Sequence, residues 1–132
     1  MKEMVRENIS RKEAECPHCG VLPSNWFLDL LQKLRTAYGK PLHFTSMYRC
    51  SVYNRRLKGY RYSVHMVNIA NAAYGGTDIR IGRYHNRKRW VVYTLALKLG
   101  FNNLEVCDRH IHIGRVPDHH PGYNKIIWGI SK

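Results

Sequence analysis

The hydrophobic and polar positions of this chain change period several times, which predicts a mixture of helices and strands. Apolar residues recur at helical spacing between Ser24, a favoured N-cap residue, and Gly39, a typical helix end. The predicted helices cover residues 24–38, 48–57 and 86–99. The apolar positions expected to face the core are Trp26, Phe27, Leu30, Leu31 and Leu34 in the first helix, and Trp90, Val91, Leu95 and Leu99 in the last.

Four short segments predict strands, which cover residues 42–46, 77–81, 104–106 and 109–114. In the second segment, alternation places Asp78 and Arg80 on one face and both isoleucines on the other. The last two segments predict a hairpin. Because helices and strands do not alternate regularly, as they would around a parallel sheet, the predicted fold class is α+β, with a small antiparallel sheet and flanking helices.

The length of the chain, 132 residues of which 44% are hydrophobic, is sufficient for one compact core. We expect a single domain over residues 16–132. Residues 1–15 alternate charge without an apolar face, which predicts a flexible N-terminal arm. No stretch approaches the roughly 18 to 20 apolar residues that span a bilayer, and the polar start lacks the apolar centre of a signal peptide. We therefore expect a protein that is cytoplasmic as synthesised.

The charge of the chain is strongly positive, since 22 Lys and Arg face 9 Asp and Glu and give a formal net charge of +13. This balance favours contact with polyanions, either nucleic acid or anionic cell-wall polymers. Basic residues near the last predicted helix are expected to form a solvated face: Arg83, Arg87, Lys88 and Arg89. Acidic residues are scarce after Asp29, which makes Asp78, Glu105, Asp108 and Asp118 candidates for chemistry.

Four cysteines, at positions 16, 19, 50 and 107, are too few and too unevenly spaced to predict a disulfide framework. Cys16-x-x-Cys19-Gly forms half of a zinc knuckle, whereas a structural zinc site needs four ligands. Cys50 and Cys107 are available to complete such a site. The sequence favours buried thiols over a second, structural zinc ion at Cys16 and Cys19.

Histidines provide the clearest chemical signal. His110 and His112 are two positions apart on a predicted strand, so their side chains point to the same face. With His65 and Asp78, they supply enough ligands for a three-ligand zinc site with an open position, the arrangement typical of catalysis. Zinc in such a site acidifies water and polarises a carbonyl group. The alternative is that these are ordinary core or surface residues among 8 histidines.

An ordered series of motifs supports the catalytic interpretation. A helix is followed by a Gly-Lys-Pro turn, a strand ending in Ser46-Met47-Tyr48-Arg49, an Asn and a Ser-x-His. An Asp-Ile strand, a helix ending in Leu-Gly-Phe and a final His-bearing strand follow. Over about residues 14 to 116, this order resembles the M15-type zinc D-Ala-D-Ala peptidases, including phage endolysins. The resemblance implies a fold shared with the hedgehog amino-terminal domain, with a zinc site on the face of the sheet.

The resemblance assigns the metal ligands to His65, Asp78 and His112. His110 resembles an auxiliary histidine that binds substrate or steadies the oxyanion. The thirteen positions from His65 to Asp78 exceed the spacing of the family motif His-x-x-Gly-x-Ala-x-Asp, so we expect an insertion in the loop between them.

Four further residues receive roles by the same resemblance. Arg49 resembles the arginine that faces substrate and stabilises developing charge, and Ser63 resembles a serine near substrate. The general base is a carboxylate close before the last histidine, but the family's usual positions carry no acid here. Asp108 is the first choice because it closes the predicted hairpin beside the site, and Glu105 is the reserve.

The resulting prediction is a zinc metallopeptidase that hydrolyses peptide bonds of bacterial peptidoglycan. It would act as a D-Ala-D-Ala carboxypeptidase or endopeptidase, and as a phage endolysin if a holin released it to the cell wall. Two alternatives remain open. One is a basic nucleic-acid-binding protein, and the other is a catalytically inactive, hedgehog-like zinc-binding module.

Overall fold

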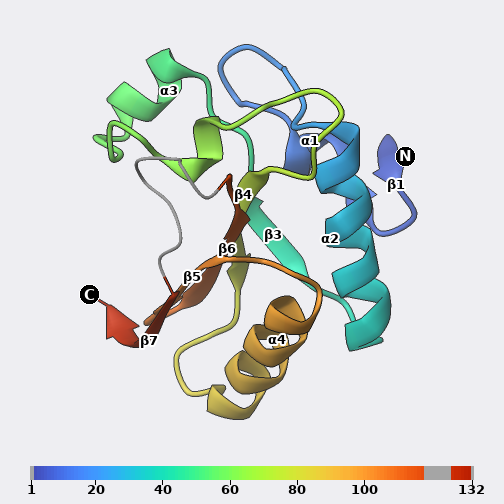
Figure 1. Ribbon diagram of the computed structural model, residues 1–132, viewed down its shortest axis with the longest axis vertical. Coiled ribbons are helices and arrows are strands. Elements are labelled where there is room, and N and C mark those ends of the chain that lie inside the picture. The colour runs from blue at the N-terminus through green and yellow to red at the C-terminus, as the bar shows by residue number, and fades with distance from the viewer. Residues whose placement is uncertain (1, 118–125, 132) are drawn as a thin grey trace.

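The computed structural model describes residues 2–117 and 126–131 of the chain (Figure 1). It has the predicted α+β class, with helices flanking a small, mainly antiparallel sheet. In chain order the elements are β1 (Met4–Arg6), β2 (Ile9–Ser10), α1 (Arg11–Ala14), α2 (Asn25–Tyr38), β3 (His43–Ser46), α3 (Ser51–Arg56), the 3-10 helix η1 (Val64–Met66), β4 (Gly75–Arg80), α4 (Asn86–Lys98), β5 (Asn103–Cys107), β6 (His110–Arg115) and β7 (Ile126–Ser131). Among the described helices, none is long and apolar enough to cross a membrane.

The main sheet has five strands in the order β3-β4-β6-β5-β7. All neighbouring strands are antiparallel except β5 and β7, which are parallel. In this register His112 of β6 lies between Asp78 of β4 and Glu105 of β5. Directly paired residues point to the same face, so strand pairing alone brings these three side chains into one row.

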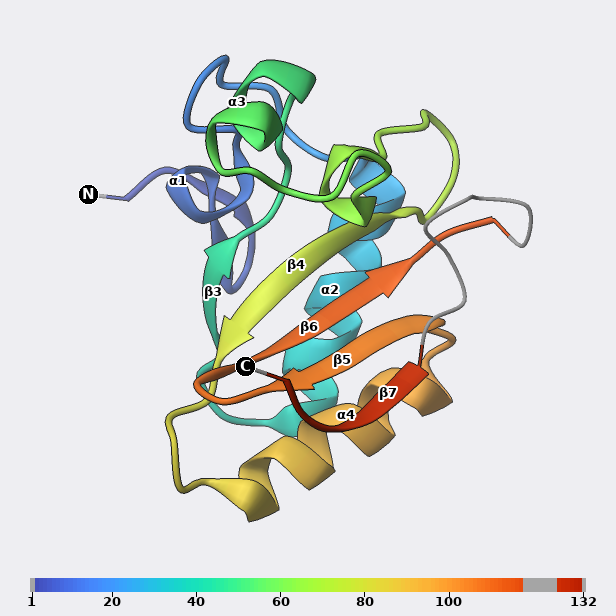
Figure 2. The ribbon, with the colours of Figure 1, turned by 90° about the vertical axis from the view of Figure 1, so that its left-hand side faces the viewer.

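The hydrophobic core lies between one face of the sheet and helices α2 and α4, which lie behind the sheet in Figure 2. Ile79, Leu104, Ile111 and Ile113 point into this core and are fully buried. Alternation along the same strands leaves Asp78 and His112 on the opposite face, which neither helix covers. The polar row therefore lies on the face away from the helices, where Asp78 and His112 keep 15% and 14% of their side-chain surface exposed.

Helix α2 follows the prediction closely because its signals are local. The Ser24 hydroxyl accepts a hydrogen bond from the backbone N–H of Phe27, and Gly39 ends the helix in the left-handed conformation. Phe27 and Leu31 are fully buried. Trp26 is an exception to the predicted core face, since 55% of its surface is exposed.

Helix α4 presents a different face to the core from the one expected. Trp90 is 56% exposed, whereas Val92 and Ala96 are fully buried. Arg89, which the sequence placed on a solvated basic surface, is only 1% exposed. The prediction was wrong here because the apolar residues of this segment do not define a single stripe, and the buried guanidinium occupies one position of the core face.

The N-terminal residues also differ from the predicted flexible arm. Within residues 1–15, strands β1 and β2 form a hairpin and Ser10 caps α1 through a capping box with Glu13. Ile9 and Ala14 are fully buried in the core. The charged residues around these two apolar positions conceal them in the sequence, because two isolated apolar side chains give no period.

Candidate metal centre

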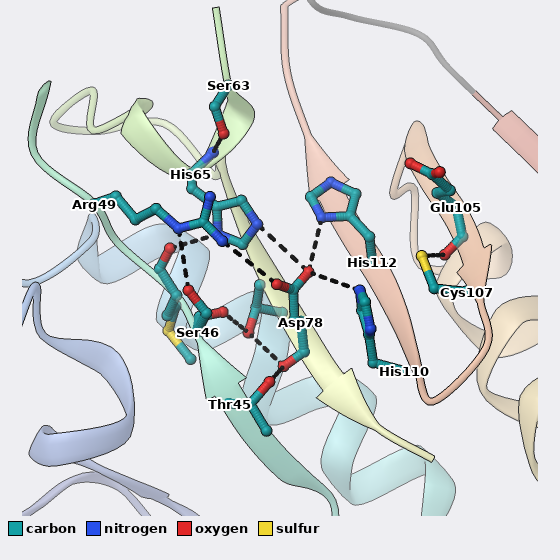
Figure 3. Close-up of polar contacts among 12 residues, drawn as sticks. Thr45, Ser46, Arg49, Ser63, His65, Asp78, Glu105, Cys107, His110 and His112 are labelled. Carbon is teal, nitrogen blue, oxygen red and sulfur yellow. Dashed lines mark hydrogen bonds and ion pairs between the residues drawn. The ribbon is translucent and has the colours of Figure 1, made fainter. Parts of the chain in front are cut away.

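The side chains of His65, Asp78 and His112 converge on the open face of the sheet (Figure 3). Asp78 Oδ1 lies 3.1 Å from His112 Nδ1 and 3.4 Å from His65 Nε2. One ligand atom from each residue lies within 4.8 Å of the other two. The loop between His65 and Asp78 therefore accommodates its extra length without separating the two residues.

These distances fit a metal ion. In a tetrahedral site with bonds of 2.0–2.1 Å, neighbouring ligand atoms lie about 3.3 Å apart. The donor set of two imidazoles and one carboxylate is the type that zinc binds in catalytic sites with three protein ligands. The group formed by His65, Asp78 and His112 is thus capable of holding a metal while leaving a coordination position for water or substrate.

His65 is held with its Nε2 atom toward Asp78. Its Nδ1–H donates to the carbonyl oxygen of Met47 at 2.7 Å, which leaves the Nε2 lone pair for a metal. Gly76 and Gly114 pair with each other under η1, and a Cβ at Gly76 would lie 2.7 Å from the side chain of Val64. The absence of side chains at these glycines allows η1 to approach the sheet and deliver His65.

His112 is oriented by a residue that the sequence did not reveal. Its Nε2 lies 2.7 Å from Oδ1 of the buried Asn103, so Nε2–H donates to this amide and Nδ1 is directed to Asp78. Metal-bound histidines commonly donate their second N–H in this way. The only signal in the sequence is that Asn103 shares a strand face with Glu105, and its significance depends on the strand register.

Burial and nearby charges shift the pKa of two candidate ligands, His65 and Asp78. Burial lowers the pKa of His65, despite its contact with Asp78, so the ring is neutral at pH 7. Desolvation alone would raise the pKa of Asp78, but contacts with His112 and His65 outweigh it and hold this pKa well below its usual range. Neutral imidazole and ionised carboxylate are the forms that bind metals.

The residues expected to serve substrate occupy different places. Arg49 reaches the site, where its Nη2 lies 3.6 Å from Asp78 Oδ2 and its Nε donates to Ser46 Oγ at 3.2 Å. His110 Nε2 lies 3.9 Å from Asp78 Oδ1, and 41% of its side chain is exposed. The Ser63 hydroxyl accepts the backbone N–H of His65 and so caps η1.

The two candidate bases lie in different surroundings. Asp108 is in the turn between β5 and β6, where Oδ2 accepts from Arg83 Nη2 at 3.0 Å and also lies 3.9 Å from Arg109 Nε. Glu105 is paired directly with His112 and stands beside it on the same face (Figure 3). Strand pairing therefore brings Glu105, and not Asp108, next to the metal-capable group.

A cavity of about 630 Å³ adjoins the site at Asp78 and His110. Its remaining lining includes three arginines, Arg80, Arg83 and Arg109. Guanidinium groups bind carboxylates through paired hydrogen bonds, so this groove favours a substrate that carries negative charge.

A His/Asp/His group on the open face of an α+β sheet, beside a charged groove, is the arrangement of a metal-dependent hydrolase. The sequence profile of the family described as Peptidase M15 matches residues 2–114, and the chain belongs to this family. Its members are zinc-dependent peptidases. No curated protein and no solved structure matches the chain.

Proposed function

We propose that this protein is a zinc peptidase that cleaves peptide bonds in bacterial peptidoglycan. The observation that carries the proposal is the convergence of three possible metal-ligand atoms beside an arginine-lined groove. His112 Nδ1 and His65 Nε2 lie 3.1 and 3.4 Å from Asp78 Oδ1. Membership of the Peptidase M15 family supports peptide hydrolysis. The proposal includes the role of a phage endolysin, reaching the wall through a holin, which the family resemblance suggests.

His65, Asp78 and His112 would hold the zinc ion, through Nε2, Oδ1 and Nδ1 respectively. When bound, zinc supplies Lewis acidity, which acidifies water and polarises the carbonyl of the scissile bond. Arg49 lies against Asp78 and would orient that carboxylate while facing the substrate. His110, exposed at the edge of the groove, would donate a hydrogen bond to the carbonyl oxygen as negative charge develops there.

Glu105 would act as the general base and move a proton from the attacking water to the leaving amine. It is the direct strand partner of His112, and the carboxylate of Asp108 is already paired with Arg83. Both of these acids were candidates from the sequence. The geometry favours Glu105 because a base must come within hydrogen-bond reach of the reacting water.

The anionic groups of the substrate would enter the arginine-lined groove. Peptidoglycan stem peptides end in a carboxylate, and a charged groove next to the metal group suits such an end. The net charge of +13 would in addition favour approach to anionic wall polymers.

The test is incubation of the zinc-loaded protein with purified peptidoglycan and with a stem peptide ending in D-Ala-D-Ala, followed by mass analysis of the products. Release of free D-alanine would identify a carboxypeptidase, and cleavage of cross-links an endopeptidase. Chelation should abolish either product and added zinc should restore it. A zinc-loaded protein that leaves both substrates intact would refute the proposal, and salt-sensitive binding to DNA would then favour a nucleic-acid-binding protein.

The identity of the base is tested by two variants in which an uncharged amide of similar shape replaces the carboxylate. Glu105→Gln should lower kcat by a factor of about 100 or more with zinc still bound, since general base catalysis contributes roughly 10²–10⁴-fold. Asp108→Asn should retain most of the activity. The opposite result would move the role to Asp108, the first choice from the sequence.

A further inference from the structure

A second group of metal-ligand side chains lies away from the candidate active site. Cys16 and Cys19 lie in the turn between α1 and α2, and Cys50 is the N-cap residue of α3. Their sulfur atoms all lie within 4.8 Å of one another. Cys50 is 34 positions from Cys16, so this grouping depends on tertiary structure and is absent from the local motif.

His18 is the candidate for a fourth ligand, since it contacts one of these thiols. His18 Nδ1 lies 3.3 Å from Cys50 Sγ. Three thiolates and one imidazole form a Cys₃His set, which is a standard composition of structural zinc sites. With Zn–S bonds of about 2.3 Å, neighbouring sulfurs in a tetrahedral site lie roughly 3.8 Å apart, so a small contraction would bring the three sulfurs to zinc, and the exposed His18 ring would turn toward them to complete the site.

The backbone around the group favours thiolates. The N–H group of Cys50 donates a hydrogen bond to Cys16 Sγ at 3.4 Å. The backbone N–H of Tyr53 donates to Cys50 Sγ at 3.4 Å. Hydrogen bonds of this kind orient metal ligands and stabilise the charge on a thiolate. These two N–H groups, one directed at each of two sulfurs, are an observation independent of the spacing of the cysteines.

We propose that Cys16, His18, Cys19 and Cys50 bind a structural zinc ion. The site is closed, because the protein supplies all four ligands and leaves no position for substrate. Cys107 is outside it: this thiol lies on β5, where its Sγ contacts the carbonyl of Glu105. The sequence favoured buried thiols instead, because it offered only half of a knuckle and did not distinguish Cys50 from Cys107 as the third cysteine.

The second ion would connect two segments that support the candidate active site. Cys50 directly follows Arg49, which contacts Asp78, and lies close after Met47, whose carbonyl holds His65. In Figures 1 and 2 the turn between α1 and α2 lies beside the start of α3. A metal here would link the N-terminal segment to the segment between β3 and α3. The helices next to the site, α1 and α3, are short.

The experiment counts zinc in the purified full-length protein and in matched Cys→Ser variants. The wild type should bind two equivalents, Cys19→Ser and Cys50→Ser one, and the control Cys107→Ser two. His112→Ala should also lose one equivalent, but it should leave the Cys₃His ion in place. A wild type with one equivalent, which Cys50→Ser retains, would overturn the proposal.

Cobalt provides a readout that does not depend on the folding of a variant. Cobalt-substituted wild type should show thiolate-to-cobalt charge-transfer bands and the intense visible bands of a tetrahedral site, and His112→Ala should retain both. His18 is exposed, so His18→Ala should not disturb the fold. This variant should change the visible bands, because one ligand is lost, while the thiolate-to-cobalt charge-transfer bands persist. Absence of charge-transfer bands in the wild type, or a disulfide between Cys16 and Cys50 by mass, would refute the site. Failure of peptidoglycan hydrolysis would not affect it.

Discussion

At the scale of single residues, the candidate metal centre depends on atoms that are not themselves ligands. The carbonyl of Met47 and the amide of Asn103 each accept the second N–H of a histidine. These contacts select the nitrogen that faces Asp78, which is Nε2 in His65 and Nδ1 in His112. Without these contacts each imidazole ring would populate two tautomers and several orientations. The lone pairs of His65 Nε2, His112 Nδ1 and Asp78 Oδ1 would then not converge.

Asn103→Ala should weaken zinc binding at the His65, Asp78 and His112 site by a factor of about 10 to 100, the usual cost of losing such a partner. The reason is that Nε2–H of His112 loses its acceptor and the ring is free to turn. Zinc competition with a chromophoric chelator measures the affinity. Asn103→Asp, which keeps an acceptor oxygen, is the control and should restore binding; equal loss in both variants would mean that Asn103 serves only packing.

At the scale of elements, Arg89 attaches helix α4 to the loops at one end of the sheet. Its guanidinium donates to the carbonyls of Gly82, Arg83, Cys107 and Asp108 and to the side chain of Asn86. Because the group is buried, these acceptors replace its hydration. The β5–β6 turn and the segment before α4, which carry two of the groove arginines, are thereby held together.

Arg89→Lys should lower the free energy of unfolding by about 2–4 kcal/mol, since lysine keeps the charge but cannot reach several acceptors at once. Urea denaturation measures the loss. Arg87→Lys, at an exposed position of the same helix, is the matched control and should change stability by less than about 0.5 kcal/mol. Equal stability of the two variants would show that water replaces the lost contacts.

Elements with local signals could be predicted from the sequence, and those that depend on tertiary contacts could not. Ser24 and Gly39 define α2 by capping, and alternation around Asp78 defines the faces of β4. The grouping of His65, Asp78 and His112 into a metal-capable set was foreseeable from the order of family motifs. Asn103, Cys50 and Arg89 escaped prediction because their roles follow from strand register or from segments far apart in the sequence.

At the scale of the whole molecule, the acid stability of the metal-free protein should reflect His65 and Asp78. Both have a lower pKa in the folded state than in the unfolded chain. The unfolded state therefore binds more protons below the ordinary pKa of histidine, about 6.5, and again near that of aspartate, about 3.9. The free energy of unfolding should be greatest above pH 6.5 and fall as the pH decreases through both ranges.

Urea denaturation of the metal-free protein between pH 7.5 and about pH 3 measures this dependence, and His65→Gln separates its two parts. The variant should lose the decrease between pH 7 and 5 and show a smaller decrease at lower pH, because Asp78 keeps its contact with His112 but loses the one with His65. A wild type whose stability is constant from pH 7.5 to 5 would mean that His65 is readily protonated in the folded state. The neutral form that binds a metal would then not be fixed by burial.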